Sequence, residues 1–347
     1  MIHQMTGRGA LENPTGRFEK IDVVPDPEWE LPDQVPTQYL MDHTKEIVAT
    51  NDSPDVCFDV SINPYRGCEH GCIYCFARPT HEYLGMSCGL DFESKILVKM
   101  QAPQLLRKKL LSKSWQPQQV VMSGVTDCYQ PIERKLKLTR QCLEVLVEFR
   151  NPVGIITKNH LITRDIDVLQ QLAEFQGIRV MVSVTTLDES LRHVMEPRAS
   201  TPQLRLEAIQ KLSEAGVPVG VMMGPLIPGL TDHEIDGVLK HAAQAGASFA
   251  GYTILRLPYG VKDLFQTWLE THYPDRKNKV LNHLRDIRGG QLNNPQFGRR
   301  TSEGEYAKII SQMFALAKKK YGLNKADKAL STAFFRRPGE GLQLSLL

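Results

Sequence analysis

The chain has 347 residues, of which 41% are hydrophobic and 23% are charged, and its formal net charge is +3. These ordinary globular values allow one large α/β domain with terminal extensions. No apolar run approaches the roughly 18–20 residues that cross a bilayer, and the N-terminus lacks a signal-peptide core, so we expect a soluble, cytoplasmic protein without a membrane partner.

The modest net charge conceals an asymmetry between the two ends of the chain. Residues 1–56 carry four Lys or Arg against eleven Asp or Glu, a net charge of −7, whereas residues 273–347 carry fifteen against six, a net charge of +9. We therefore predict an acidic, extended arm at 1–56, a core at 57–272 and a basic extension at 273–347. The basic extension favours a polyanionic partner, nucleic acid first, although a merely solvated surface explains the charge equally well.

From residue 57 onward, short apolar runs alternate with amphipathic segments. The runs predict strands at 57–62, 119–124, 154–158, 179–185, 217–226 and 249–257. Helical spacing predicts helices at 104–112, 133–150, 162–175, 203–214 and 232–245, and a basic helix at 302–321. Because strands that alternate with helices form parallel sheets with right-handed crossovers, about six such units predict an α/β fold, a partial (βα)6 TIM-type barrel. Active-site residues of such barrels follow the carboxyl ends of the strands.

Three cysteines share one loop, NPYRGCEHGCIYCFARP, which follows the first predicted strand. Cys68, Cys72 and Cys75 have the spacing C-x3-C-x2-C, and an aromatic residue, Tyr74, precedes the third. Three thiolates in one tight loop can hold three irons of a [4Fe–4S] cluster. The fourth iron then has no protein ligand, so a small molecule can bind there and accept an electron.

Zinc is the alternative occupant of such a cysteine-rich loop. A closed zinc site needs four ligands, and the fourth would have to be Cys57, Cys88 or His70, none of which lies at a familiar zinc-finger spacing. A disulfide framework is disfavoured, because the 7 cysteines are unevenly spaced and no signal peptide precedes them. The bacterial ferredoxin run also differs, because it has a fourth cysteine followed by proline.

A C-x3-C-x-aromatic-C loop after a strand, followed by alternating strands and helices, resembles the radical S-adenosylmethionine (radical SAM) superfamily. The resemblance covers about residues 57–260, and within the superfamily it points to the spore photoproduct lyases and the uncharacterised bacterial proteins grouped with them. It implies a [4Fe–4S] cluster and S-adenosylmethionine (SAM) as cofactors, and an electron donor such as a flavodoxin or ferredoxin. It also implies cleavage of SAM to methionine and a 5′-deoxyadenosyl radical.

The same resemblance assigns the contacts of SAM to residues near the strand ends. The segment SGVTD (123–127) takes the place of the one that binds the amino-acid end of SAM, and Thr126, Lys158 and Ser183 match carboxylate and ribose contacts. Tyr74, backed by the loop GPLIPG (224–229), would frame the adenine. The full expected set is Tyr74, Gly124, Thr126, Asp127, Lys158, Ser183, Glu196 and Arg198. Each of these residues could instead cap a helix or satisfy the backbone.

The chain departs from the lyases at two positions that matter for hydrogen transfer. Gly124 and Phe76 stand where the lyase has a hydrogen-donating cysteine and a tyrosine, and neither side chain can donate a hydrogen atom. We therefore predict that Cys128, relayed by Tyr129, is a displaced donor and forms the catalytic pair. A small buried cysteine is the alternative reading of Cys128.

The segment 77–93, ARPTHEYLGMSCGLDFE, follows the cysteine loop directly and is dense in polar and aromatic residues. Side chains that could line the mouth of the substrate site are Arg78, His81, Glu82, Tyr83, Asp91 and Glu93. His81 and Glu82 could equally well only pin the loop.

The last five residues, Gln343–Leu347 (QLSLL), follow a Gly-Glu-Gly spacer. They match the pattern Q-L-x-L-hydrophobic, by which many bacterial replication and repair proteins dock on the DNA sliding clamp. A five-residue pattern also occurs by chance. Upstream, FFRRPGEG (334–341) pairs aromatic rings with arginines, which can serve base stacking and phosphate contact or simple packing on the core.

These features predict a radical SAM enzyme of undetermined lyase or transferase class that acts on nucleic acid. DNA repair of the spore photoproduct lyase type is the first candidate. Radical modification of RNA or of a protein side chain is the alternative among enzymes. A non-catalytic, DNA-associated metal-binding module is the alternative from a different class.

Overall fold

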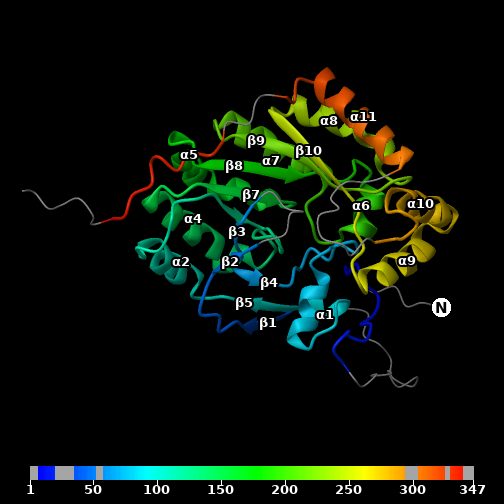
Figure 1. Cartoon of the computed structure of the whole chain (residues 1–347), viewed down its shortest axis with the longest axis horizontal. Helices are drawn as coiled ribbons and strands as arrows, with labels where there is room; N and C mark the ends of the chain where they lie inside the picture. Colours follow the sequence, from blue (N-terminus) through cyan, green and yellow to red (C-terminus); the bar gives the residue numbers. More distant parts are fainter. Residues whose placement is uncertain (1–6, 20–34, 52–57, 294–303, 325–328, 339–347) are drawn as a thin grey trace, which may run out of the picture.

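The structure, a computed structural model, describes residues 7–19, 35–51, 58–293, 304–324 and 329–338. Its larger sheet contains β2 (Val48–Thr50), β3 (Val60–Ile62), β6 (Val120–Met122), β7 (Val153–Thr157), β8 (Ile178–Ser183), β9 (Val219–Leu226) and β10 (Phe249–Ile254). Across the sheet the order is β10-β9-β8-β7-β6-β3-β2, and every pair is parallel except β2 with β3 (Figure 1). The six parallel strands confirm the predicted α/β fold with a partial TIM-type barrel.

Helices pack on the outer face of this sheet (Figure 1). They include α2 (Ala102–Leu111), α4 (Leu138–Phe149), α5 (Ile166–Glu174), α7 (Pro202–Glu214) and α8 (Ile235–Gln244). On β8, Val180 and Val182 belong to the core shared with these helices. Met181, between them, faces the other way, because its Cε lies 3.4 Å from where a Cβ of Gly251 on β10 would be. The inner face therefore carries the intervening residues of each strand.

The predicted single helix at 133–150 is wrong. The structure has α3 (Glu133–Leu136) and then α4, separated at Lys137, whose φ of 54° is left-handed. The reason is the buried carboxylate of Glu133, which accepts the amide of Thr139 at 3.0 Å and so begins a new helix. Helical periodicity alone does not reveal such a break.

A smaller sheet lies beside the barrel and contains β1 (Gln38–Met41), β5 (Lys95–Val98) and β4 (Tyr65–Arg66), in that order. β1 is parallel to β5, and β4 is antiparallel to it. Residues of the acidic segment 1–56 therefore supply one strand to each sheet, β1 here and β2 in the barrel. The division of the chain into three parts stays a prediction.

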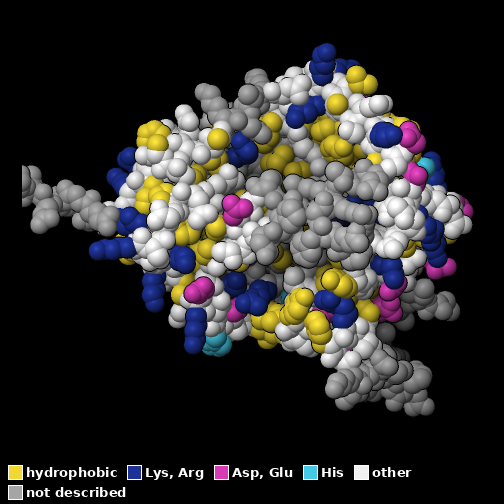
Figure 2. Space-filling view, viewed as in Figure 1, with side chains coloured by type: hydrophobic (Ala, Val, Ile, Leu, Met, Phe, Trp, Pro, Cys, Tyr) yellow, Lys and Arg dark blue, Asp and Glu magenta, His cyan; other side chains and the backbone are white. Residues whose placement is uncertain are grey.

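Three helices follow the barrel strands: α9 (Val261–His272), α10 (Pro274–Ile287) and α11 (Glu305–Lys320). α11 lies within the predicted basic helix at 302–321. Figure 2 shows Lys and Arg side chains over the end of α11 and along the edge that carries α10. Within the described residues, no helix is long and apolar enough to cross a bilayer.

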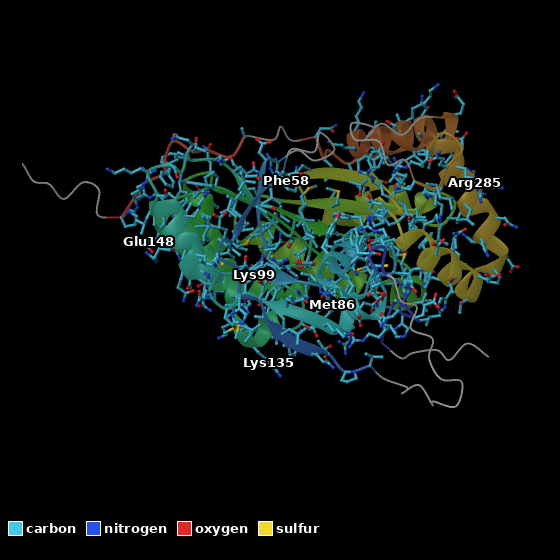
Figure 3. The ribbon with its side chains drawn as sticks, turned by 60° about the horizontal axis from the view of Figure 1, so that its bottom comes forward. Phe58, Met86, Lys99, Lys135, Glu148 and Arg285 are labelled. Atoms are coloured by element: carbon cyan, nitrogen blue, oxygen red, sulfur yellow. The ribbon has the colours of Figure 1, made fainter. Side chains whose placement is uncertain are left out.

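The described C-terminal residues pack on the amino-terminal side of the barrel. Phe335 lies 6.3 Å from Phe149, ring centroid to centroid, at the end of α4. Arg336 Nε donates to the backbone oxygen of Glu148 at 3.0 Å (Glu148 is labelled in Figure 3). Arg337 donates to the backbone oxygen of Trp115 at 3.0 Å. These contacts show packing on the core, one of the two predicted roles of this segment, while residues 343–347 lie outside the described part.

Candidate functional site

The cysteine loop lies between β4 and the segment that precedes β5, and backbone bonds hold it from two sides. The amide of Cys68 donates to the Phe92 carbonyl at 3.0 Å. The amide of Ile73 donates at 3.1 Å to the carbonyl of Met195, the last residue of α6 (Glu189–Met195). Cys68 is 7% exposed, Cys72 is 8% exposed, and the third cysteine of the loop is half-buried.

The environment of the three thiols suits a metal cluster. Burial is the main cause that raises the pKa of Cys68, Cys72 and Cys75, that of Cys72 to about 12. Nearby carboxylates add to the shift, Asp127 at Cys68 and Glu196 at Cys72. Because a thiolate is the form that binds metal, such thiols ionise only when bound cations compensate their charge.

A zinc ion and a cubane cluster make different demands on the three thiols. Among the described residues, no group of three or more His, Cys, Asp or Glu could hold one metal ion. A zinc ion requires its ligands to converge on one point, whereas a cubane cluster provides a separate iron for each thiolate. Cys57, a candidate fourth zinc ligand, lies outside the described residues.

Asp127 connects the cysteine loop to the end of β7. Its carboxylate accepts from the Thr157 hydroxyl and the Lys158 amide, both at 2.8 Å. His70, between the first two cysteines, places Nδ1 3.4 Å from this carboxylate and Nε2 3.0 Å from Asn159 Nδ2. Burial alone would raise the pKa of Asp127, but His70 and the backbone amides outweigh it and lower the pKa. Asp127 therefore orients the loop, and its direct contact with SAM stays a prediction.

Glu196 is fully buried at the end of α6 and joins three other side chains. Its carboxylate accepts from the hydroxyls of Tyr74 and Thr185 and forms an ion pair with Arg205, which is also fully buried. Burial alone would raise the pKa of Glu196, but Arg205 and Lys158 lower it to about 2. This network fixes the Tyr74 side chain beside the loop. Sequence reasoning missed Arg205, because nothing local distinguishes it from other helix arginines.

Lys158 and Asn63 present polar atoms that no described residue satisfies. Lys158 follows β7 and forms no ion pair within the described residues; its Nζ lies 5.8 Å from the centroid of the Tyr74 ring. Asn63 follows β3, and its Oδ1 is buried without a hydrogen-bond partner. Ser183, which is 2% exposed, ends β8 at the same edge of the sheet. Sequence analysis named Lys158 and Ser183 but missed Asn63, whose position directly after a strand was the available signal.

Three other predicted SAM contacts are engaged or enclosed by the protein itself. Thr126 donates its hydroxyl to the Tyr65 carbonyl at 2.9 Å. Arg198 lies 3.5 Å from the Glu69 carboxylate, inside the cysteine loop. A Cβ added at Gly124 would come within 3.1 Å of a neighbouring aromatic ring, so the backbone here is closely packed. The roles of these residues toward SAM stay predictions.

Cys128 and Tyr129 lie in the main hydrophobic core. Cys128 is 1% exposed and Tyr129 is 0% exposed. The Cys128 amide donates to Ser123 Oγ at 2.9 Å, and its carbonyl accepts from Thr139 Oγ1 at 2.6 Å. Burial raises the pKa of both side chains. This placement agrees with the alternative of a small buried cysteine, and the hydrogen-donor role stays a prediction.

Most of the side chains named in the segment 77–93 are enclosed by the protein, and their role at a substrate mouth stays a prediction. Four of its named side chains are buried: Arg78, His81, Glu82 and Glu93. Asp91 forms an ion pair with Lys95 at 3.0 Å. Tyr83 is 70% exposed, so it is the named side chain that is most open to a partner.

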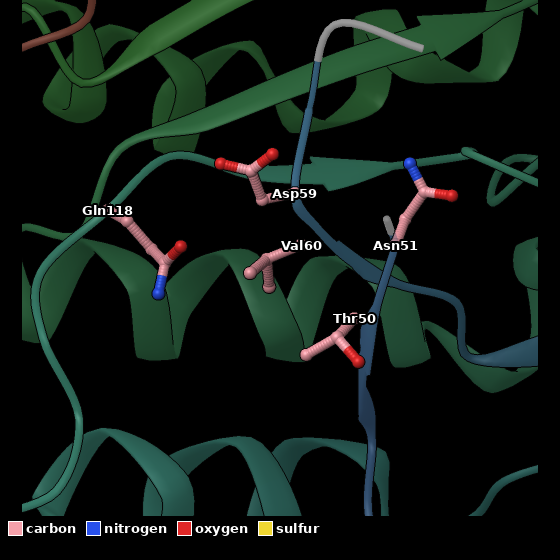
Figure 4. Close-up of a pocket in the computed structure, with 5 residues that line it drawn as sticks. All are labelled: Thr50, Asn51, Asp59, Val60 and Gln118. Carbon is pink, nitrogen blue, oxygen red and sulfur yellow. The ribbon is translucent and has the colours of Figure 1, made fainter. Parts of the chain in front are cut away.

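A polar cavity of about 400 Å³ lies elsewhere in the barrel wall. Figure 4 shows its lining residues: Thr50, Asn51, Asp59, Val60 and Gln118. Asp59 and Gln118 precede β3 and β6, so this cavity is at the amino ends of the strands. The cysteine loop and the polar groups described above are at the carboxyl ends, so the cavity is separate from the candidate site.

The sequence profile of the radical SAM superfamily matches residues 62–242. An uncharacterised protein of Mycobacterium tuberculosis is 36% identical over 220 residues, which cover 63% of this chain and 65% of that protein. An uncharacterised protein of Methanocaldococcus jannaschii is 30% identical over 222 residues, which cover 64% of this chain and 79% of that protein. The chain therefore matches less than two thirds of the mycobacterial relative.

Among solved structures, spore photoproduct lyase complexed with dinucleoside spore photoproduct is similar, with a TM-score of 0.60. The likeness covers 87% of this chain and 85% of that chain at 15% sequence identity. At this identity it shows the fold alone, and it agrees with the partial barrel described above.

Proposed function

We propose that this chain, which belongs to the radical SAM superfamily, is a radical SAM enzyme that acts on nucleic acid, first of all damaged DNA. Cys68, Cys72 and Cys75 bind its [4Fe–4S] cluster. The superfamily uses this cluster together with SAM. When bound, the pair supplies a 5′-deoxyadenosyl radical by reductive cleavage of SAM. The observation that carries the proposal is the loop of three thiols beside the unpaired cation of Lys158 at the carboxyl ends of the barrel strands.

The side chains around the loop divide into ligand-binding and loop-holding groups. Lys158 binds the carboxylate of SAM, since its ammonium group forms no ion pair or hydrogen bond with a described residue. Asn63 offers a buried amide oxygen to a donor of the cofactor. Asp127, through His70, holds the loop in place, and Glu196 keeps the Tyr74 ring in position.

An exposed aromatic surface supports a nucleobase substrate. It consists of Arg17, Phe18, Tyr83 and Tyr259. Arg17 lies 3.6 Å above the Tyr259 ring, and the Phe18 and Tyr83 rings are 5.2 Å apart. The three rings are 56–70% exposed. Gly260, next to Tyr259, lies against the segment that follows the cysteine loop, so this surface adjoins the candidate site. Aromatic rings and guanidinium planes are the groups on which unpaired bases stack.

Exposed cations support contacts with the phosphates of a nucleic acid. They lie on α10 and α11 and include Arg276, Lys279, Arg285 and Lys319. Spore photoproduct lyase, whose fold this chain shares, was solved with a dinucleoside spore photoproduct, and that also favours a DNA substrate. Phosphate contacts of this kind make binding steeply dependent on salt.

Hydrogen transfer and partners complete the proposal. Gly124 occupies the position of the lyase's donor cysteine, so Cys128 with Tyr129 is the donor pair that the chain itself offers. A flavodoxin or ferredoxin supplies the electron. The tail Gln343–Leu347 docks on the DNA sliding clamp.

Anaerobic reconstitution tests the cofactor part. We expect a brown protein that bleaches on reduction and releases 5′-deoxyadenosine and methionine from SAM. A colourless protein that binds zinc would refute it. Cys88→Ala is the matched control, because Cys88 is buried outside the three-cysteine spacing and its loss should leave the cluster intact.

Binding to ultraviolet-treated single-stranded DNA, RNA and a peptide mixture tests the substrate class. We expect Tyr83→Ala to weaken DNA binding about tenfold, as loss of one stacked base would. Phe334→Ala removes another exposed ring, in the C-terminal segment on the amino-terminal side of the barrel, and should change nothing. Preference for RNA or for peptide would refute the DNA assignment in favour of that alternative.

A further inference from the structure

A strap of three residues near the N-terminus, Arg8, Gly9 and Ala10, covers the cysteine loop although it precedes the stretch that the superfamily profile matches. The amides of Gly9 and Ala10 donate to the two carboxylate oxygens of Glu93, at 2.9 and 2.8 Å. Arg8 donates to the backbone oxygen of Glu93 at 2.6 Å. A Cβ added to Gly9 would lie 1.9 Å from the Gly71 carbonyl oxygen, so the strap and the loop are in direct backbone contact.

Arg78 connects Glu93 to the loop from inside. Both side chains are fully buried, and they form an ion pair. The guanidinium also donates to the backbone oxygens of Gly71, Cys72, Cys88 and Gly89, at 3.3, 3.0, 3.2 and 3.0 Å. These four carbonyls and the carboxylate match the five N–H donors of an arginine. A rigid fork with every donor engaged holds the loop in one conformation.

The ion pair of Arg78 and Glu93 places two opposite charges next to the cysteine loop. The Arg78 guanidinium bonds the Cys72 carbonyl, and its backbone amide donates to the Cys75 carbonyl at 3.2 Å. An electron that enters a cluster bound here is attracted by the cation of Arg78 and repelled by the anion of Glu93. Neither side chain reaches water, so solvent ions screen these effects little.

We propose that Arg78 and Glu93 are positioning residues that set both the retention and the reduction potential of the cluster, and that the strap keeps their ion pair in place. The proposal rests on the proposed binding of the cluster by the three cysteines. It makes the N-terminal segment part of the cluster pocket.

The test uses the full chain, reconstituted anaerobically, with iron analysis and a redox titration followed by electron paramagnetic resonance. In that titration one electron from dithionite reduces [4Fe–4S]²⁺ to [4Fe–4S]⁺. We expect Arg78→Gln to lower the midpoint potential and Glu93→Gln to raise it, because each variant removes one sign of charge. If the midpoint potential shifted in the same direction in both variants, or did not shift, the proposal would be overturned. An effect that only loosens the loop does not depend on which charge is removed.

Further variants separate charge from hydrogen bonding. Arg78→Lys keeps the charge without the fork, so we expect a midpoint near that of the wild type and faster loss of iron. If Arg78→Gln retains no cluster, Arg78→Lys is compared with Glu93→Gln instead. The midpoint potential should rise in Glu93→Gln and not in Arg78→Lys.

The strap has its own variant and control. Gly9→Ala should release iron to a chelator roughly tenfold faster, as loss of a supporting contact at a metal site does. Gly16→Ala, where the added Cβ would meet the Glu19 side chain, should behave as the wild type. Iron release from Gly9→Ala at the wild-type rate would refute the strap. A wild-type chain that binds no cluster would refute the proposed function instead.

Discussion

Replacement of Glu196 by Gln tests whether the network behind Tyr74 is structural. Glu196 and Arg205 are both fully buried, and the carboxylate also accepts from Tyr74 and Thr185, the latter at 2.8 Å. A glutamine oxygen can still accept from the two hydroxyls. Its NH2 group, however, would face the N–H groups of Arg205. The positive charge of Arg205 would then remain buried without a counter-charge.

The loss of stability expected for Glu196→Gln follows from this geometry. Removal of one partner of a buried ion pair destabilises a protein by about 3–5 kcal/mol. For a chain of this size, 1 kcal/mol lowers the melting temperature by about 2 °C, so we expect a decrease of roughly 6–10 °C. The pH dependence should change as well. The pKa of Glu196 is lowered to about 2, so its ionisation stabilises the fold fully above about pH 4.5. That stabilisation is lost as the pH falls toward 2.

Thermal unfolding of the reduced apoprotein, followed by circular dichroism at pH 3 and pH 6, measures both effects. The wild type should lose more stability than Glu196→Gln between the two values. Glu207→Gln is the control, because Glu207 is a partly exposed helix residue paired with Lys211. If Glu196→Gln has the same melting temperature as the wild type, the buried ion pair does not stabilise this part of the fold.

Three further changes test single side chains. Lys158→Met should weaken the binding of SAM to the reconstituted enzyme about tenfold, because it removes a charged hydrogen bond to the SAM carboxylate. Calorimetry measures this affinity, and an unchanged value would show that Lys158 does not contact SAM. Cys128→Ala should leave SAM cleavage intact but stop the formation of normal product, because it removes the proposed hydrogen donor. Normal product from this variant would rule out the donor role and leave Cys128 as a small buried core residue. Burial lowers the pKa of Lys99, labelled in Figure 3, to about 8, so wild-type stability should rise as the pH increases from about 8 to 10.5. Lys99→Met should abolish that rise and stabilise the protein at pH 7 by on the order of 3 kcal/mol, measured by urea unfolding; equal stability at pH 7 would contradict the shift.

Local patterns predicted the barrel strands well, because burial on both faces of a parallel sheet leaves a continuous apolar run that is visible in a short window. The helix at 133–150 shows the limit of such patterns. Its apolar spacing is helical throughout, yet the carboxylate of Glu133 binds the amide of Thr139 and divides it. Burial of that carboxylate depends on residues distant in the chain, such as Tyr65, whose hydroxyl donates to it at 2.5 Å.

The same limit applies to the polar residues at the strand ends. Sequence analysis could name Thr126, Asp127 and Glu196 as candidates for SAM because the family resemblance assigns the SAM contacts to these segments. In the structure their polar atoms bond to other parts of the protein. Lys158 has no such partner among the described residues, and neither does the overlooked Asn63.

The sequence by itself determined the three-thiol loop and the order of strands and helices, because ligand spacing in a tight loop and side-chain alternation are both properties of a few neighbouring residues. Only the tertiary structure decided which polar groups hold the loop and which remain available to a ligand. Arg8 and Glu93 are 85 positions apart, and their contact exists only once the sheets have assembled. Hydrogen-bond satisfaction depends on such distant partners, so no local pattern records it.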